Sequence, residues 1–485
     1  MKRTTFEFPI QLSRGGEPLR TQLIRALRSA VQNGRLPAGS ALPATRVLAA
    51  DLGLSRGIVV EAYEQLIAEG YFTARRGAAT RVAASHAGAI NERRSRAAAR
   101  APLAAPPPRF DFRPGMPDVS LFPARAWMRA LRRAWASGSS AHLDYPDPRG
   151  VTETRAALAT YLNRSRATIA DAERIVMCTG FAQAARLAGE VLHARGVRRI
   201  AVEDPGHVEQ CADLAAAGIE LVRIPVDASG LVVERLLRTS VRAVLVAPAH
   251  QYPTGAVLAP ERRAALLEWA VRREAYIIED DYDAEYRYDH EPIGALQGLA
   301  PEHVIYAGSA SKMLAPSLRQ GWLVLPRALV SDVAIAKLGA DRGSPTLEQR
   351  AFAAFLDVGD LDRHLRRTRT VYRQRRDLMV AALRASLPDA EIRGVAAGTH
   401  LLVELPRSVD ERALVDAAAR AGIRVYAGRI YHSKPERARP SLLLGYGSIL
   451  DEDIPLGIRE LAALVRASAF RGSRHPTRGH TPPAA

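Results

Sequence analysis

Short apolar runs alternate with helical stretches over most of the chain, from Phe110 to about residue 375. The runs that we predict as strands are Arg174–Cys178, Arg199–Glu203, Ala243–Ala247, Ala275–Asp280, Val304–Ala307 and Trp322–Leu325. Strands that alternate with helices form a mainly parallel sheet with helices on both faces. From about Arg376 a smaller α/β segment follows, with strands predicted at Gly398–Val403 and Ser441–Tyr446. The expected fold class of this part is therefore α/β.

The beginning of the chain has a different pattern. Apolar residues over Leu19–Val31 recur at helical spacing, a second helix fits Ala44–Leu52, and Ser55 caps a third. The pieces 71–74 and 80–82 alternate around a turn, as the strands of a small hairpin would. A helix, a turn and a second helix with a polar N-terminus form the arrangement that inserts into the major groove of DNA.

Residues 84–109 separate the two patterns and are rich in Ala, Arg and Pro, with three consecutive prolines near their end. Nothing in this stretch can bury an apolar face, which is typical of a linker. We therefore expect a DNA-binding domain over 1–83, a linker over 84–109 and a larger domain over 110–470. The basic tail 471–485 contains Gly and Pro, and we expect it to be disordered.

The composition limits the possible environments and partners. The net charge of +17 suggests a polyanionic partner, although a bias toward arginine could produce it alone. Cys178 and Cys211 give neither a disulfide framework nor the spacing of metal ligands, so we expect no metal site and a reducing compartment. The start lacks the apolar stretch of a signal peptide, and no run reaches 18 apolar residues. We therefore expect a cytoplasmic protein without a membrane span.

Arginines gather near two predicted helix N-termini and in the hairpin turn. Arg46 lies at the start of the second helix, and Ser55 and Arg56 lie at the start of the third. There they could contact phosphates or guanine edges, aided by the backbone donors of the helix start. Arg75 and Arg76 in the turn could reach an adjacent minor groove or phosphate. The alternative is a solvated helical face that serves only for packing.

Lys312 is one of only four lysines among 68 basic residues. It follows Ser309 and Ser311, and Arg319 stands seven positions later. Lysine can form a Schiff base, whereas the guanidinium of arginine stays protonated. The pattern indicates covalent chemistry at Lys312, and the alternative is a surface lysine in a serine-rich turn.

Several other residues fit the cofactor pyridoxal phosphate. Asp280 and Tyr282 follow an apolar strand, at the edge of the sheet where ligands of open α/β proteins gather. An aspartate that faces the pyridine nitrogen keeps it protonated and makes the ring an electron sink. A neighbouring tyrosine can donate a hydrogen bond to the ring phenolate. The alternative for these residues is a carboxylate-rich loop.

A phosphate site is predicted beside them. Gly180, Phe181 and Ala182 open a helix after another strand, and backbone donors at a helix start suit a phosphate. Arg319 could hold the same phosphate with two hydrogen bonds, with Ser309 and Ser311 adding hydroxyl groups. His207 follows a further strand, and its ring could stack on the cofactor, although a lone histidine in a turn is more often structural.

These motifs resemble those of two known families. The stretch Leu19–Val82, with Leu42-Pro43-Ala44-Thr45-Arg46 and Ser55-Arg56, resembles the winged helix-turn-helix of GntR-type regulators. Residues from about 110 to 465 are similar to fold-type I aminotransferases. The sequence motifs that carry this similarity are Phe112–Asp118, Tyr145–Gly150, His250–Gly255 and Glu279–Asp283. The whole chain resembles the MocR/GabR-like subfamily of GntR-type regulators.

The resemblance implies a winged helix-turn-helix joined to a fold-type I aminotransferase-like domain, which has a large mainly parallel sheet and a smaller C-terminal α/β subdomain. It implies that Arg46, Ser55 and Arg56 contact a double-stranded DNA operator. It further implies that Lys312 joins pyridoxal phosphate as a Schiff base. The protein would then sense this cofactor, another vitamin B6 form, an amine or an amino acid. Family members form head-to-tail homodimers, and such a protein is nucleoid-associated when bound to DNA.

The sequence departs from these families at several positions. Ile58 stands where GntR members usually have Thr, and Gly77–Val82 replaces the usual Gly-Ser-Gly-Thr wing tip. Tyr252 occupies the place of the Asn before Pro-Thr-Gly in aminotransferases. The late strand 442–446 lacks the Arg that grips the substrate carboxylate, a loss of about 1.5–3 kcal/mol per charged hydrogen bond.

A substitute for this clamp could come from Arg437 or Arg439 in the preceding loop. Without one, we expect at most a residual aminotransferase-type half-reaction. The alternatives are an active aminotransferase with an accessory DNA-binding domain, and a GntR regulator that uses no cofactor.

Overall fold

The structure is a computed structural model that describes residues 10–75, 77–83, 107–136, 144–288 and 293–472. The chain divides into two compact units, Met1–Pro106 and Pro107–Ala485. Most of the predicted linker 84–109 and of the predicted tail 471–485 lies outside the described residues, so both stay predictions. Within the described ranges, no helix combines the length and the apolar character needed to cross a bilayer.

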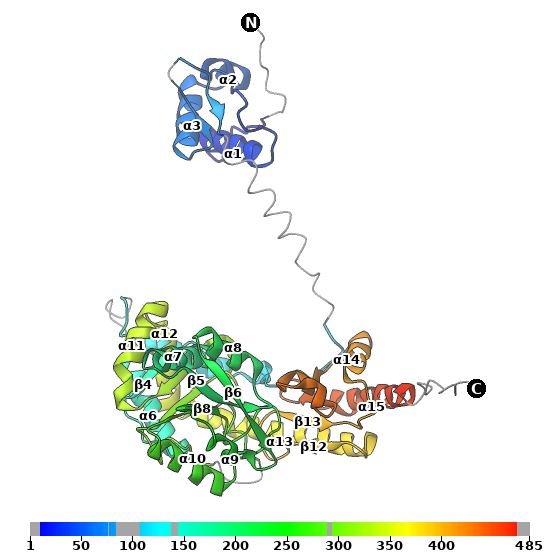
Figure 1. Cartoon of the computed structure of the whole chain (residues 1–485). Coiled ribbons are helices and arrows are strands. Elements are labelled where there is room, and N and C mark those ends of the chain that lie inside the picture. Colours follow the sequence, from blue (N-terminus) through cyan, green and yellow to red (C-terminus); the bar gives the residue numbers. More distant parts are fainter. Residues whose placement is uncertain (1–9, 76, 84–106, 137–143, 289–292, 473–485) are drawn as a thin grey trace, which may run out of the picture. The chain divides into compact units, whose positions relative to one another are not determined.

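The N-terminal unit consists of three helices followed by a small antiparallel hairpin (Figure 1). Its elements are α1 (Leu19–Gln32), α2 (Thr45–Leu52), α3 (Arg56–Ala68), β1 (Phe72–Thr73) and β2 (Arg81–Val82). α1 buries Leu23, Leu27 and Val31 because residues four positions apart share one face of a helix. The Tyr63 hydroxyl donates to the Pro43 carbonyl at 3.0 Å, which ties α3 to the start of α2. The predicted three helices and hairpin are confirmed.

The second unit contains an eight-stranded sheet with the strand order β4-β11-β10-β9-β8-β5-β6-β7. Its strands are β4 (Ile175–Cys178), β5 (Arg199–Asp204), β6 (Glu220–Asp227), β7 (Gly230–Leu231), β8 (Ala243–Val246), β9 (Tyr276–Asp281), β10 (Val304–Ser309) and β11 (Gly321–Val324). The pairs from β10 through β9, β8 and β5 to β6 are parallel. β11 is antiparallel to both of its neighbours. The predicted mainly parallel sheet is confirmed.

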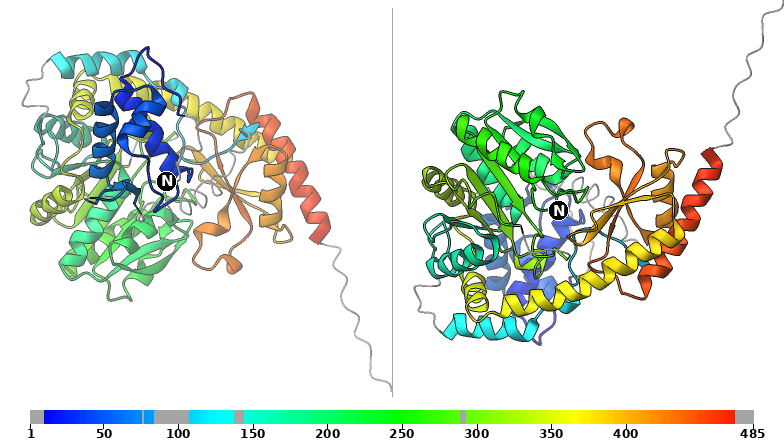
Figure 2. Two further views of the ribbon diagram at one scale, coloured as in Figure 1. Left: turned by 90° about the horizontal axis from the view of Figure 1, so that it is seen from above. Right: turned by 90° about the horizontal axis from the view of Figure 1, so that it is seen from below.

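Helices cover both faces of this sheet (Figure 2). They are α5 (Ala124–Ala136), α6 (Thr152–Arg166), α7 (Phe181–Ala194), α8 (Val208–Ala216), α9 (Val233–Leu236), α10 (Pro260–Arg272), α11 (Arg327–Asp341) and α12 (Thr346–Asp357). Alternate residues of a strand point to opposite faces. In β5, Ile200 and Val202 join the apolar core of α7, α8 and α11, whereas Ala201 joins that of α9 and α10.

A second sheet follows the long helix α13 (Asp360–Ser386), and it has four antiparallel strands in the order β12-β13-β16-β15. The elements of this region are β12 (Glu391–Arg393), β13 (His400–Glu404), α14 (Glu411–Arg420), β14 (Ile423–Arg424), β15 (Tyr426–Ala427), β16 (Ser441–Gly445) and α15 (Asp453–Gly472). β14 pairs in parallel with β3 (Phe110–Asp111). Residue 376, near which we expected the smaller segment to begin, lies inside α13.

Candidate functional site

A cavity of about 240 Å³ lies where β9 and β10 end and α7 begins. Nine of the residues predicted to bind the cofactor line this cavity: Lys312, Asp280, Tyr282, Arg319, Ser309, Ser311, Phe181, Ala182 and His207. The tenth, Gly180, lies against the Arg319 guanidinium. The wall also contains Gly115, Glu209, Gln210 and Asp213, which the sequence did not reveal. The structure therefore brings the predicted residues together.

Lys312 stands in the turn after β10, and its amine faces the backbone of Gly115. A Cβ atom at Gly115 would come within 3.2 Å of Lys312 Nζ, so the missing side chain leaves room for the amine. Burial lowers the pKa of the Lys312 ammonium, against the opposing effect of the Asp283 and Asp280 carboxylates. A lower pKa leaves a larger fraction of the amine neutral and nucleophilic.

Asp280 near the end of β9 carries an unsatisfied buried oxygen. Its Oδ2 accepts from Gln210 Nε2 at 2.5 Å, whereas Oδ1 has no hydrogen-bond partner among the described residues. Burial raises the pKa of this carboxyl to about 8. A buried acceptor without a donor is costly, because it loses its hydration without compensation. A protonated ring nitrogen would supply the missing donor and would favour the ionised carboxylate.

Several hydrogen-bond donors gather at the N-terminus of α7. Gly180 is the N-cap residue with φ 93°, and a Cβ atom there would meet Arg319 Nη2 at 2.8 Å. Arg319 itself donates to the Thr179 carbonyl, which holds its guanidinium beside the helix start. Ser309 and Ser311 line the same cavity. Free backbone donors, one guanidinium and two hydroxyl groups together suit a phosphate.

Two aromatic rings form another part of the cavity wall. The His207 and Tyr252 ring centroids lie 4.7 Å apart with planes inclined by 32°. His207 Nδ1 pairs with Glu209 Oε2 at 2.9 Å, and burial lowers the pKa of the imidazole. The Tyr252 hydroxyl donates to the Tyr431 hydroxyl at 3.0 Å. His207 is therefore placed at the wall, with its ring against a protein side chain as well as the cavity.

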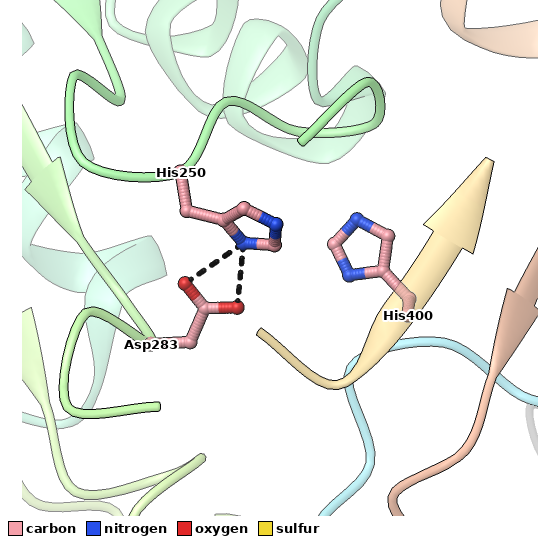
Figure 3. A group of neighbouring side chains, drawn as sticks. All are labelled: His250, Asp283 and His400. Carbon is pink, nitrogen blue, oxygen red and sulfur yellow. Dashed lines mark hydrogen bonds and ion pairs between the residues drawn. The ribbon is translucent and has the colours of Figure 1, made fainter. Parts of the chain in front are cut away.

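Three buried side chains with metal-ligand chemistry lie close together: His250 in the loop after β8, Asp283 after β9, and His400 at the start of β13 (Figure 3). Their ligand atoms lie within 4.8 Å of one another. Both oxygens of Asp283 already contact His250 Nδ1, at 2.9 and 3.1 Å. We assign no metal to this group, and the expected lack of a metal site stays a prediction.

Neither candidate for a substrate-carboxylate clamp reaches the cavity. Arg439 donates to Glu404 Oε2 at 3.0 Å and to the Leu405 carbonyl at 3.2 Å. Arg437 is exposed at the end of a short 3-10 helix. Over the described parts of the chain, Arg319 is the one arginine that lines the cavity, and it lies beside the start of α7.

The predicted DNA contacts lie on the surface of the N-terminal unit. Arg46, Ser55, Arg56 and Arg75 are exposed, whereas Arg76 lies outside the described residues. Ser55 occupies the N-cap position of α3 as predicted, but its side chain accepts no cap hydrogen bond. A free hydroxyl next to the exposed N–H groups of a helix start can meet a phosphate.

Ion pairs distinguish these arginines from the three arginines of α1, Arg20, Arg25 and Arg28. On α1, Arg20 pairs with Glu61 at 3.2 Å and Arg28 pairs with Glu69 at 2.7 Å. In the described residues, Arg46, Arg56 and Arg75 have no ion-pair partner. Their charge is therefore not neutralised within the unit.

Comparison with known proteins defines the class of each unit. Residues 115–443 match the family "Aminotransferase class I and II", and residues 19–82 match "Bacterial regulatory proteins, gntR family". The second unit also has the fold of the Pyrococcus horikoshii kynurenine aminotransferase. That likeness has a TM-score of 0.69 and 24% identity, and it covers 78% of this chain and 98% of that one. The protein is thus a gntR-type helix-turn-helix joined to an aminotransferase-type domain.

Two transcriptional regulators are similar to this chain over nearly the whole length of both proteins. The chain is 33% identical to the probable rhizopine catabolism regulatory protein MocR of Rhizobium meliloti, over 94% of this chain and 95% of that protein. It is 34% identical to the pyridoxine biosynthesis transcriptional regulator PdxR of Corynebacterium glutamicum, over 89% and 92% respectively. The chain belongs to the MocR-like family of GntR-type transcriptional regulators, which confirms the resemblance.

Proposed function

We propose that the protein is a DNA-binding transcriptional regulator whose operator affinity is controlled by pyridoxal phosphate at Lys312. The observation that carries this proposal is a cavity equipped for that cofactor but not for an amino-acid carboxylate. The buried amine of Lys312 and the unpaired oxygen of Asp280 share this cavity. The gntR-type unit of the same chain is the part that would bind DNA under the control of the cofactor.

When bound, pyridoxal phosphate supplies an aldehyde that a lysine amine can join and an electron-poor ring. On the protein side, the amine of Lys312, whose pKa burial lowers, would be the nucleophile. Asp280 Oδ1 would accept from the ring nitrogen, while Gln210 holds the other carboxylate oxygen in place. The start of α7 and Arg319 would hold the phosphate, with hydroxyl groups from Ser309 and Ser311.

The missing carboxylate clamp favours a sensor over an efficient aminotransferase. An arginine that binds a carboxylate through two charged hydrogen bonds contributes about 1.5–3 kcal/mol for each. Arg439 cannot take this role because it is bound to Glu404 and Leu405. Amino acids would therefore bind weakly and would react slowly.

A vitamin B6 form or an amine without a carboxylate is the effector class that this cavity suits. Glu209 and Asp213 add negative charge to the wall, which favours a cationic amine over a carboxylate. The relative PdxR is named for the regulation of pyridoxine biosynthesis, which supports a vitamin B6 form. The effector can control DNA binding only if it binds two conformational states of the protein with different affinities, one state that binds DNA and one that does not.

DNA binding by the N-terminal unit is the output of the switch. The exposed Arg46 and Arg56 lie at the starts of α2 and α3, where a recognition helix meets the major groove. Arg75 and Arg76 of the hairpin turn are proposed to contact the flanking backbone. A head-to-tail homodimer would contain two helix-turn-helix units, which could bind the two half-sites of one operator.

Borohydride trapping tests this assignment. Pyridoxal phosphate is added to the full chain, the mixture is reduced, and the modified peptide is located by mass spectrometry. The proposal expects the label on Lys312, together with a gel shift of DNA from upstream of the protein's own gene that changes on adding the cofactor. A label on Lys337 or Lys434, or a gel shift that does not change when the cofactor is added, would overturn the proposal.

An active aminotransferase is the second candidate, because the amine, the Asp280 carboxylate and the phosphate site are all retained. Rapid half-transamination with several amino acids, followed in the cofactor spectrum, would favour this candidate. Absence of turnover together with cofactor-dependent DNA binding favours the sensor.

A further inference from the structure

The Nδ1 atom of His250 connects Tyr282, which lines the cavity, to the buried carboxylate of Asp283. His250 Nδ1 lies 2.9 Å from Asp283 Oδ2, 3.1 Å from Asp283 Oδ1 and 3.0 Å from the Tyr282 hydroxyl. His250 comes from the loop after β8, and the two others come from the turn after β9. Figure 3 shows the imidazole edge of His250 directed at the Asp283 carboxylate. Tyr282 lines the cofactor cavity, whereas the His250–Asp283 pair lies behind it.

The burial of Asp283 decides where the hydrogen on His250 lies. The Asp283 side chain is 2% exposed, and in the described structure its carboxylate has no hydrogen-bond partner other than His250. A buried carboxylate requires a donor, so Nδ1 carries a hydrogen. This holds for the neutral ring and for the doubly protonated ring alike. A carboxylate next to histidine Nδ1 fixes the tautomer in the same way in catalytic triads.

The hydrogen on His250 Nδ1 determines whether the Tyr282 hydroxyl donates or accepts in their hydrogen bond. A nitrogen that carries a hydrogen cannot accept another, so Tyr282 cannot donate to His250. The phenol oxygen accepts a share of the Nδ1 hydrogen, and its own hydrogen is directed elsewhere. His250 is the one hydrogen-bonding contact of the Tyr282 hydroxyl in the part of the chain that the structure describes. The remaining direction is the cavity.

The charged groups around Asp283 and His250 do not change the assignment of a hydrogen to His250 Nδ1. Asp280, Asp281 and Lys312 face it from the strand ends, and His400 faces it from β13. Burial raises the pKa of Asp283, while the neighbouring His250 and Lys312 oppose the rise. Burial and His250 lower the pKa of His400 well below its usual value, so this ring stays neutral. His400 donates no hydrogen bond to the pair among the described contacts.

We infer that the Asp283–His250 pair sets the direction of the Tyr282 hydrogen bond and makes Tyr282 a fixed donor toward the ring oxygen of the bound cofactor. Asp283 and His250 are positioning residues, because they act through Tyr282. The inference rests on the proposed function for the identity of the acceptor. The tautomer of His250 is independent of any cofactor.

The first experiment uses the full chain before any cofactor is added. Nitrogen-15 chemical shifts of the histidine rings are recorded, and the His250 signals are assigned by their loss in His250→Asn. The inference expects a protonated Nδ1 at neutral pH. It expects Asp283→Asn to weaken this preference, as an aspartate-to-asparagine change does in catalytic triads. An unprotonated Nδ1 in the unmodified protein would overturn the inference, whether or not pyridoxal phosphate binds.

The second experiment measures the visible absorbance of bound pyridoxal phosphate against pH. If a hydrogen-bond donor to the ring oxygen is lost, that oxygen carries more negative charge. The nearby Lys312 nitrogen then keeps its proton to a higher pH. Asp283→Asn and Tyr282→Phe should therefore each raise the pH at the midpoint of the absorbance change. In the double variant, Asp283→Asn should add little to the shift that Tyr282→Phe alone produces.

Asp281→Asn is the matched control, because it removes a buried carboxylate at the end of β9 that bonds Arg166 and Tyr306 and does not contact His250. Its shift should persist in the Tyr282→Phe background. Fully additive shifts for Asp283→Asn would contradict the inference, since the pair would then act through its charge alone. If the unmodified protein takes up no pyridoxal phosphate, the proposed function fails, and the His250 shifts still decide the tautomer.

Discussion

The guanidinium of Arg319 lies against the backbone of Gly180, so close that a Cβ atom on Gly180 would come within 2.8 Å of Arg319 Nη2. The contact joins the turn after β10 to the start of α7, two segments that the sequence separates by more than a hundred residues. It places a permanent positive charge next to the free N–H groups of a helix start. This relationship makes the phosphate end of the cavity sensitive to a single methyl group.

Gly180→Ala should therefore weaken the binding of pyridoxal phosphate. The new methyl group displaces Arg319, and the φ of 93° strains any other residue at this position. The lost charged hydrogen bonds predict a fall of roughly tenfold to a hundredfold in cofactor affinity, measured by absorbance titration.

Gly196→Ala provides the matched control for backbone strain. Gly196 has a φ of 87°, but a Cβ atom there meets nothing within 4 Å. Its substitution should lower the melting temperature to a similar extent and leave cofactor affinity unchanged. Equal losses of affinity in both variants would assign the effect to strain rather than to Arg319.

The stability of the cofactor-free protein should depend on Asp280 and on pH. Burial raises the pKa of Asp280 to about 8, above the value of about 3.9 for an unfolded aspartate. The folded state thus binds more protons between these values, and its stability falls as the pH rises through them. The contribution of this one group is at most about 1.4 kcal/mol per pH unit. Thermal unfolding between pH 5 and 8 measures it.

Asp280→Asn should reduce this pH dependence and raise the melting temperature of the cofactor-free protein at pH 8. The amide carries no charge to desolvate, whereas the ionised carboxylate has one oxygen without a donor. The same variant should lose cofactor affinity, because an amide cannot keep the ring nitrogen protonated. A melting temperature that falls at pH 8 in the cofactor-free state would contradict the assignment of Asp280 as an unsatisfied acceptor.

DNA affinity should depend on the unpaired arginines of the N-terminal unit. Each phosphate contact that is lost lowers the slope of log affinity against log salt by about 0.9. Arg46→Ala and Arg56→Ala should therefore weaken operator binding and flatten this slope. Arg20→Ala is the control, since Glu61 already pairs with Arg20. A control that weakens binding as much as Arg56→Ala would place the DNA on a different face.

Patterns of neighbouring residues allowed most strands, and the residues that line the cavity, to be predicted. Lys312 follows β10 and Asp280 lies near the end of β9, so they meet because these parallel strands end on one edge. Arg319 reaches the same edge because it precedes β11, an antiparallel strand that begins opposite the end of β10. β6 escaped prediction because Arg223 and Pro225 interrupt its apolar residues near the edge of the sheet. A partly exposed strand of this kind lacks the apolar run that identifies its neighbours.

Contacts between distant segments could not be predicted. Gln210 lies in the first turn of α8, in no recognisable motif, yet its side-chain amide donates to Asp280. From the sequence, the stretch His250–Gly255 showed only its resemblance to aminotransferases. Its pairing with Asp283 exists only because β8 and β9 are adjacent in the sheet. Such pairs depend on the order of strands, which one sequence does not specify.

Operator affinity with and without the cofactor tests the central claim most directly. Fluorescence anisotropy of labelled upstream DNA is measured with the full chain and with Lys312→Ala, each with and without pyridoxal phosphate. An allosteric coupling of about 1–3 kcal/mol predicts a change in affinity of roughly 5- to 150-fold for the unmodified protein. The variant should show one affinity, whatever the cofactor concentration. A cofactor response that persists in Lys312→Ala, or that is missing from the unmodified protein, would contradict the account.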